Sequence, residues 1–214
     1  MGAKTWMVVY SNSDIASTLQ SHPLLDREAS TSLAKRLFPD FRLEPLEDET
    51  LAFTCPPDNE ILVGCYSGVC IVAASEFGID YPSKLPTRFL DSSLGNSIHL
   101  HAMHSAVDWL AFSVWESGEL RRSLSLSPDS GVMEDIGSKF EFELPFWEGK
   151  HPAVDPEDEE DSYPFPFHPL ELGEAALANF FGYQLEGFVD PTLLDPDSIT
   201  LMRFKRRKPR WKFW

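Results

Sequence analysis

Three of the six histidines lie within six residues of one another, and a carboxylate follows four positions later. The segment is His99-Leu-His101-Ala-Met-His104-Ser-Ala-Val-Asp108. Imidazole and carboxylate groups are ligands that suit zinc and other transition metals. If the segment is a strand, His99 and His101 share a face with their Cα atoms about 6.6 Å apart, within reach of one ion. His104 joins them only if the chain turns after Ala102.

Two interpretations of this cluster follow. In the first, the chain is a metal-binding protein or a metal-dependent hydrolase, with zinc held by His99, His101, His104 and Asp108. In the second, no cofactor is bound and the histidines are hydrogen-bonded strand residues beside a core. The acidic residue expected beside the third histidine of a metallohydrolase site is replaced by Ser105, and the other histidines are isolated. The incomplete ligand set favours the second interpretation.

The elements that position this segment follow from the hydrophobic pattern. Apolar runs predict strands over 4–11, 109–115, 120–127 and 140–144, and two strands or one bent strand over 61–74. Apolar residues at helical spacing predict helices over 26–38 and 168–182, and a shorter one over 82–93. Runs of strands with helices at their ends are typical of the α+β class.

We therefore expect an α+β fold in a single domain, a mostly antiparallel sheet with helices packed on one face. Residues 1–150 form the core in this scheme, and residues 151–165 are an acidic linker because 155–161 hold six acidic residues. Residues 166–190 form a helix that packs on the core. Residues 191–214 are a flexible basic-aromatic tail.

The composition is that of a folded, soluble protein. The chain has 214 residues, 43% hydrophobic and 24% charged, close to the globular average. No segment is typical of a membrane span or an export signal. The three cysteines cannot all pair, which fits a reducing compartment, and Cys65 and Cys70 are expected to be buried structural thiols. We expect a cytoplasmic protein with no transmembrane segment.

The charge is strongly negative and unevenly spread. Residues 203–214 hold seven of the 18 basic residues and no acidic one, so the formal net charge of −16 becomes −23 without them. A surface this acidic repels phosphate backbones and attracts cations. We therefore expect a basic protein as partner and no nucleic-acid binding by the main domain.

The basic tail interleaves aromatic and cationic residues, a pattern that contacts single-stranded nucleic acid or an anionic surface. Pro209 prevents a continuous amphipathic helix there. Folding back onto the acidic body, or disorder, is the favoured alternative, because chain ends are mobile unless they are tied down.

Four strings carry a resemblance to a known family. They are MGAKTW at 1–6, LHAMHSAVDW at 100–109, SLSLSPDSG at 123–131 and PFHPLELGEAA at 166–176. On these strings the chain resembles an uncharacterised bacterial family, a domain of unknown function, over roughly residues 1–187. The resemblance implies a cytoplasmic bacterial protein and supplies no activity and no catalytic residue.

The function expected from the sequence is binding without catalysis. The first hypothesis is a non-enzymatic cytoplasmic protein whose acidic surface binds and regulates a cationic protein, as immunity-type inhibitors do. The metal-dependent enzyme above is the alternative. A third possibility is a small molecule held in an aromatic pocket lined by residues such as Trp109 or Trp115, although large aromatics at strand spacing are more often core.

Overall fold

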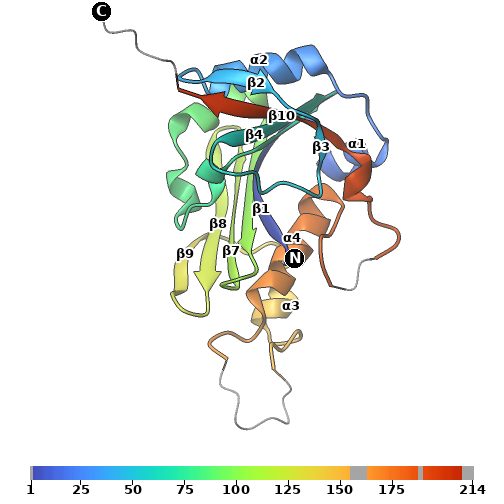
Figure 1. Cartoon of the computed structure of the whole chain (residues 1–214). Helices are drawn as coiled ribbons and strands as arrows, with labels where there is room; N and C mark the ends of the chain where they lie inside the picture. Colours follow the sequence, from blue (N-terminus) through green and yellow to red (C-terminus); the bar gives the residue numbers. More distant parts are fainter. Residues whose placement is uncertain (1, 155–162, 188–189, 209–214) are drawn as a thin grey trace, which may run out of the picture.

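The architecture is an antiparallel sheet with helices against it (Figure 1). The computed structural model describes residues 2–154, 163–187 and 190–208. In it the strands run in the order β2-β10-β4-β5-β1-β6-β7-β8-β9, and β3 pairs with β10. Every described strand pairing is antiparallel, which confirms the predicted mostly antiparallel sheet.

The strands are β1 (Lys4–Ser11), β2 (Arg42–Pro45), β3 (Glu49–Thr50), β4 (Glu60–Tyr66), β5 (Val69–Ala73), β6 (Ser97–His104), β7 (Trp109–Glu116), β8 (Glu119–Ser127), β9 (Gly131–Gly137) and β10 (Thr200–Arg207). The α-helices are α1 (Ile15–Gln20), α2 (Arg27–Leu37), α3 (Leu144–Trp147) and α4 (Pro169–Phe181). Short 3-10 turns are η1 (Ser75–Phe77), η2 (Pro82–Lys84), η3 (Thr87–Phe89), η4 (Ser92–Leu94) and η5 (Pro196–Ser198).

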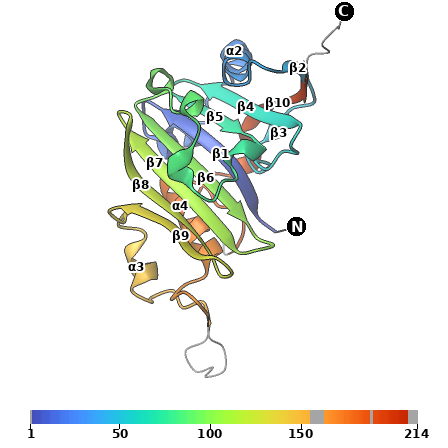
Figure 2. The ribbon, with the colours of Figure 1, turned by 90° about the vertical axis from the view of Figure 1, so that its left-hand side faces the viewer.

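Helices cover both faces of the sheet, so the prediction of a single covered face is wrong. Neighbouring residues of a strand point to opposite faces. Val8 of β1 packs in one apolar cluster with Leu33 of α2, whereas Met7 packs in another with Leu177 of α4. Figure 2 shows the 3-10 segment of residues 75–94 in front of the sheet and α4 behind it. Both faces of the central strands are therefore buried.

The strongest sequence patterns are confirmed. The strand over 4–11 is β1, the helix over 26–38 is α2, and the hairpin over 109–127 is β7 and β8. The run over 61–74 forms two strands, β4 and β5, rather than one bent strand. The helix predicted over 168–182 is α4, which His168 caps at its start and Gly182 at its end. The helix predicted over 82–93 is instead three separate 3-10 turns, because Pro86 disfavours helix at the residue before it.

The strand predicted over 140–144 is wrong. Glu143 is fully buried and accepts hydrogen bonds from the Phe140 backbone N–H (2.8 Å) and from Arg122 Nη2 (2.7 Å). These contacts fold the segment into a turn that leads into α3. Phe140 and Phe142 then stack on each other, with ring centroids 6.0 Å apart, and both contact Phe180 of α4. In a regular strand both side chains would also share a face, so the alternating pattern could not distinguish the two structures.

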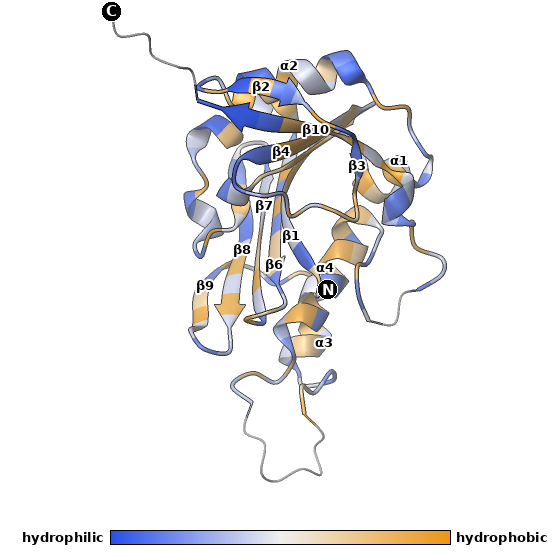
Figure 3. Ribbon diagram, viewed as in Figure 1, coloured by the Kyte–Doolittle hydropathy of each residue, from blue (hydrophilic) through white to orange (hydrophobic). Residues whose placement is uncertain are grey.

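The flexible tail predicted over 191–214 is wrong for residues 200–207. These residues form β10, which pairs with β2 on one side and β4 on the other. Leu201 and Phe204 are buried in the two apolar clusters, although Figure 3 shows hydrophilic colour along much of the strand. Burial of these two side chains and the pairing with β2 and β4 together oppose the entropy lost on ordering the segment.

The basic residues of β10 pair with acids of the body. Arg203 contacts Glu49 (2.8 Å) and Glu60 (2.7 Å), and Arg206 contacts Glu76. Arg207 forms a further pair with Glu44. These arginines therefore pair within the chain, as the fold-back alternative expected for this part of the tail.

The structure describes only part of the predicted acidic linker and of the predicted tail. The acidic run at 155–161 and residues 209–214 lie outside the described residues. Of the described end of the predicted linker, Phe165 is buried in an apolar cluster with α4. Among the described residues, no helix is long and apolar enough to cross a membrane.

Replacing Phe204 by Ala tests the assignment of β10. The substitution removes a buried aromatic ring, so we expect the free energy of unfolding to fall by about 3–5 kcal/mol in denaturant titrations. Lys208→Ala, at an exposed position just beyond the strand, is the control and should change it by less than about 0.5 kcal/mol. Equal stability of Phe204→Ala and the parent protein would show that this segment is not part of the folded sheet.

Candidate functional site

His99 and His101 share a face of β6, as the sequence predicts, and this face packs against α4. The His99 ring lies 5.2 Å from the Phe180 ring and 6.0 Å from the Phe181 ring, measured between centroids. The His101 ring is fully buried and lies 6.3 Å from the Phe181 ring. Both histidines are thus parts of the interface between the sheet and α4.

His101 connects three elements by hydrogen bonds. Its Nε2 lies 3.1 Å from the carbonyl oxygen of Gly173 in α4, and because a carbonyl only accepts, Nε2 carries the proton. The Nδ1 atom of the neutral ring then accepts from the hydroxyl of Thr5 in β1, also at 3.1 Å. Both ring nitrogens are therefore used within the fold.

Burial lowers the pKa of both histidines to about 4, because the protein interior disfavours the charged imidazolium. The hydrogen bond to Gly173 opposes the shift at His101 without cancelling it. Both rings are neutral at physiological pH.

His104 lies on the opposite face of the sheet. β6 continues without a turn to His104, so the pleat directs this ring away from His101. Its Nδ1 accepts a hydrogen bond from the backbone N–H of Ala106 (3.1 Å). The ring packs 5.6 Å from the indole of Trp6.

Asp108 is held by a histidine that the sequence pattern left isolated. The residue occupies the tight turn between β6 and β7 with a φ of 46°, and its carboxylate lies 3.5 Å from His168 Nε2. His168 Nδ1 in turn accepts from the Leu170 backbone N–H at the start of α4 (3.3 Å). This pair connects the turn to the helix.

The four predicted metal ligands therefore do not converge. Two lie beneath α4, one lies on the other face, and the fourth contacts His168. Within the described parts of the chain, no three histidine, cysteine or carboxylate groups are placed to hold one ion. His99 and His101 are structural residues in the contact between β6 and α4, whereas His104 lines a cavity.

That cavity lies beside the turn between β6 and β7 and has aromatic walls. Its volume is about 320 Å³, and the Trp6 and Trp109 rings lie 5.8 Å apart at an angle of 47°. The lining residues come from four separate segments: Trp6, Gly78, Asp80, His104, Val107, Trp109, Ser127, Asp129, Ser130 and Met133. Trp109, which the sequence offered as an aromatic pocket residue, is 8% exposed.

Two carboxylates from different loops line the same cavity. Asp80 precedes η2, and Asp129 lies in the turn between β8 and β9. Both side chains are exposed. The Ser127 hydroxyl accepts from the Ser130 backbone N–H (3.2 Å), which holds the second turn in shape. The cavity therefore combines aromatic faces with negative charge.

Gly78 positions the Trp6 indole. A Cβ atom at residue 78 would lie 3.0 Å from the ring, so a side chain there would push the loop or the indole away. The absence of a side chain lets the loop after η1 lie directly against the aromatic wall.

The surroundings of the imidazole in this wall favour its neutral form. Burial lowers the pKa of His104, and the charge of Lys4, its partner across the β1–β6 pairing, lowers it further. Lys4 is not among the lining residues, and the lining contains no lysine or arginine. Among the lining residues, only the two carboxylates therefore carry a full charge.

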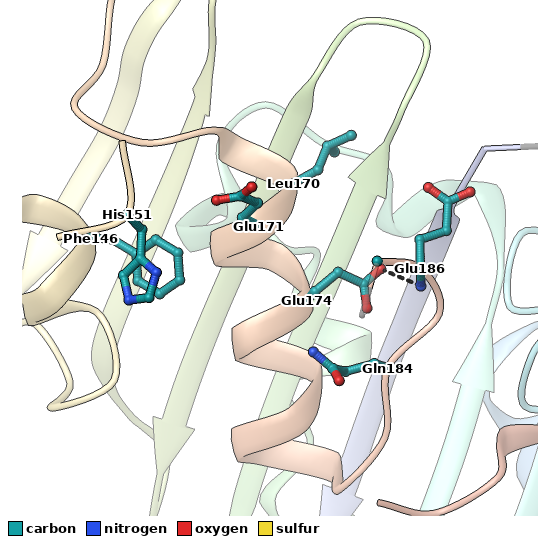
Figure 4. Close-up of a pocket in the computed structure, with 8 residues that line it drawn as sticks. Phe146, His151, Leu170, Glu171, Glu174, Gln184 and Glu186 are labelled. Atoms are coloured by element: carbon teal, nitrogen blue, oxygen red, sulfur yellow. Dashed lines mark hydrogen bonds between the residues drawn. The ribbon is translucent and has the colours of Figure 1, made fainter. Parts of the chain in front are cut away.

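A larger cavity of about 570 Å³ lies between α4, α3 and the segment after α4 (Figure 4). Its central carboxylate, Glu174, is only 7% exposed and accepts from the backbone N–H groups of Leu185 (2.7 Å) and Glu186 (3.1 Å). Both carboxylate oxygens are thus engaged in holding the chain after α4. Burial raises the pKa of Glu174 to about 7, although these two hydrogen bonds oppose the shift.

Comparison with known proteins gives a family and no activity. A family model described as a family of unknown function (DUF6928) matches residues 5–204. Neither a curated protein nor a solved structure matches the chain.

Acid should weaken the fold through His101. His101 takes up a proton near pH 6.5 in the unfolded chain and only near pH 4 in the folded chain. Its contribution to the free energy of unfolding is therefore fully present above pH 6.5 and is lost as the pH falls towards 4. His101→Gln removes this titration and also costs about 2–3 kcal/mol at pH 7.5 through the lost hydrogen bonds. Denaturant titrations from pH 4.5 to 7.5 measure both effects, with the exposed His151→Gln as control. An acid dependence that is unchanged in His101→Gln would contradict the buried neutral ring.

Glu174 should act in the opposite direction. Its folded pKa of about 7 lies above the ordinary value of 4.5, so its contribution to stability is greatest below pH 4.5 and is lost as the pH rises through 7. At about 1.4 kcal/mol per pH unit, the loss over this interval is at most ~3.5 kcal/mol. The stability of Glu174→Gln relative to the parent protein should therefore rise between pH 5 and 8. The exposed Glu171→Gln, on the same helix, should show no such change, and parallel curves for both variants would rule out the raised pKa.

Proposed function

Since the chain belongs to a family of unknown function (DUF6928), we propose its function from its own residues: it is a non-enzymatic binding protein for a basic partner. In this proposal a lysine or arginine side chain of the partner enters the cavity walled by Trp6, His104 and Trp109. The observation that carries it is the meeting of two indoles and two carboxylates in one cavity whose lining includes no lysine or arginine.

Aromatic walls suit a cation because the face of an aromatic ring is electronegative. A lysine or arginine group over an indole gains about 0.5–1 kcal/mol at exposed sites and about 2 kcal/mol when it is desolvated. Trp6 is half-buried and Trp109 is buried, so an inserted side chain would lose much of its contact with water between them. His104, whose lowered pKa favours the uncharged imidazole, adds a third ring to the wall.

The two carboxylates supply direction and charge. Asp80 and Asp129 approach the cavity from separate loops, so they would flank an ammonium or guanidinium group whose stem lies along the rings. An exposed ion pair contributes less than about 1 kcal/mol, so the carboxylates select for a cation more than they hold it.

The charge of the whole chain favours the same class of partner. The formal net charge is −16, and Arg203, Arg206 and Arg207 already pair with glutamates of the body. A protein of this charge attracts a cationic protein over distance and speeds its association, particularly at low salt. A basic protein that the chain neutralises or regulates fits these features.

A short lysine-rich peptide is a direct probe of the proposal. Its binding, followed by tryptophan fluorescence, should weaken as salt rises from 50 to 500 mM. Asp129→Asn should lower the affinity about two- to fivefold, and Trp6→Phe should lower it by a similar factor because phenylalanine binds cations less well than tryptophan.

Glu141→Gln is the matched control. It removes the same charge from an exposed carboxylate that is not among the cavity residues, so its affinity should stay that of the parent protein. A peptide with glutamine in place of lysine should not bind. Equal losses in Asp129→Asn and Glu141→Gln would show general charge attraction without the cavity, and would refute the site.

A further inference from the structure

Two of the three cysteines face each other across a hairpin. Cys65 of β4 and Cys70 of β5 are directly opposed in the strand pairing, and the turn between them contains Gly68 with a φ of 84°. Directly opposed residues on antiparallel strands have Cα atoms about 4.5 or 5.5 Å apart. Both values fall in the range that a disulfide requires, about 4.4–6.8 Å.

The two sulfur atoms already lie together. Both cysteines are free thiols, and Cys70 Sγ lies 2.7 Å from Cys65 Sγ on the face that packs against α2. Formation of a bond between them therefore needs only a small adjustment of the side chains, with no change of strand register.

The surroundings hold Cys65 in place and leave Cys70 the more accessible. The Cys65 backbone N–H donates to the Ser30 hydroxyl (2.8 Å), and its carbonyl oxygen accepts from the Asp26 N–H (2.8 Å) at the start of α2. Cys65 is 3% exposed, whereas Cys70 is half-buried. The neighbouring Cys65 thiol lowers the pKa of Cys70 by hydrogen bonding, which favours Cys70 as the thiolate.

We propose that Cys65 and Cys70 form a reversible redox site, oxidised to a disulfide by a low-molecular-weight disulfide. The Cys70 thiolate attacks one sulfur of the small disulfide, which breaks its S–S bond and releases one small thiolate. The Cys65 thiol then gives up its proton and attacks Cys70 Sγ, releasing the second small thiol. The protein loses two electrons and two protons, and the small disulfide gains them as two thiols.

The position of the pair favours reversibility over a structural role. The bond would close only the loop of residues 66–69, which the hairpin already orders. Chain-entropy stabilisation grows with the length of the closed loop, so this bond adds little to the fold and is readily reduced again.

Cys55 provides an internal reference thiol. It follows β3 and lines a separate cavity with Ala52, Phe53 and Leu185, and burial raises its pKa. Oxidation of the folded protein should therefore leave Cys55 reduced while the pair is consumed.

The test uses the full-length folded protein in glutathione buffers of increasing disulfide fraction. Reactive thiols, counted under denaturing conditions after acid quenching, should fall from three to one, and the intact mass should fall by two hydrogens. Peptide mapping should recover Cys65 linked to Cys70, and excess reduced glutathione should restore three thiols. Three thiols throughout, in buffers that oxidise a reference protein dithiol, would overturn the proposal.

Single variants separate the two steps. Cys65→Ser should accumulate a mixed disulfide with glutathione at Cys70, because the resolving thiol is gone. Cys70→Ser should gain no glutathione, and Cys55→Ser should oxidise as the parent protein does. Stable glutathionylation of the parent protein at Cys70, without the internal bond, would also contradict the proposal. Cys55→Ser leaves the hairpin intact, so it preserves the test if either of the other variants fails to fold.

Discussion

The position of α4 depends on one buried hydrogen bond, from His101 of β6 to the carbonyl oxygen of Gly173. The bond requires the helix backbone to approach the sheet closely. A Cβ at residue 173 would lie 2.6 Å from Met103 Sδ and 3.1 Å from Leu110 Cδ1, both in fully buried side chains. The close approach of α4 to the sheet therefore requires both a glycine at position 173 and a neutral histidine at position 101. From this contact follow the burial of Phe181 and the path of the chain after α4, which Glu174 holds through its two backbone hydrogen bonds.

One face of β6 packs against α4, and its other face forms part of the cavity wall. The pleat directs His99 and His101 towards α4 and His104 towards the two indoles. Histidines that are close in sequence therefore lie on opposite faces of the sheet. A cluster of one residue type in a short segment therefore says little about a shared site when the segment is a strand. The proposed binding cavity also depends on the neighbouring loops, since Asp80 and Asp129 come from segments that no local pattern connects with Trp109.

Much of the fold was predictable from local patterns, and the exceptions have physical causes. β1, α2, the β7–β8 hairpin and α4 have continuous apolar runs or clear capping residues, and the sequence predicts them correctly. β10 was missed because its arginines suggested a solvated tail, whereas glutamates of distant segments pair with them. The turn at Phe140 was missed because Glu143 is pinned by Arg122, a contact that spans 21 residues. Of the candidate site, the sequence offered Trp109 as a pocket residue and His104 as a ligand, but convergence with Trp6 is a property of the tertiary structure.

The placement of β10 has a consequence for the order of events during synthesis. β4 needs this strand as its outer neighbour, yet more than a hundred residues separate the two in the chain. At a translation rate of about 5–20 residues per second, β4 leaves the ribosome on the order of ten seconds before its partner exists. Throughout that interval its open hydrogen-bonding edge, flanked by Ile61 and Val63, is exposed to other nascent chains. Slow elongation or a shortage of chaperones should thus reduce the yield of this protein more than that of one whose neighbouring strands are close in sequence.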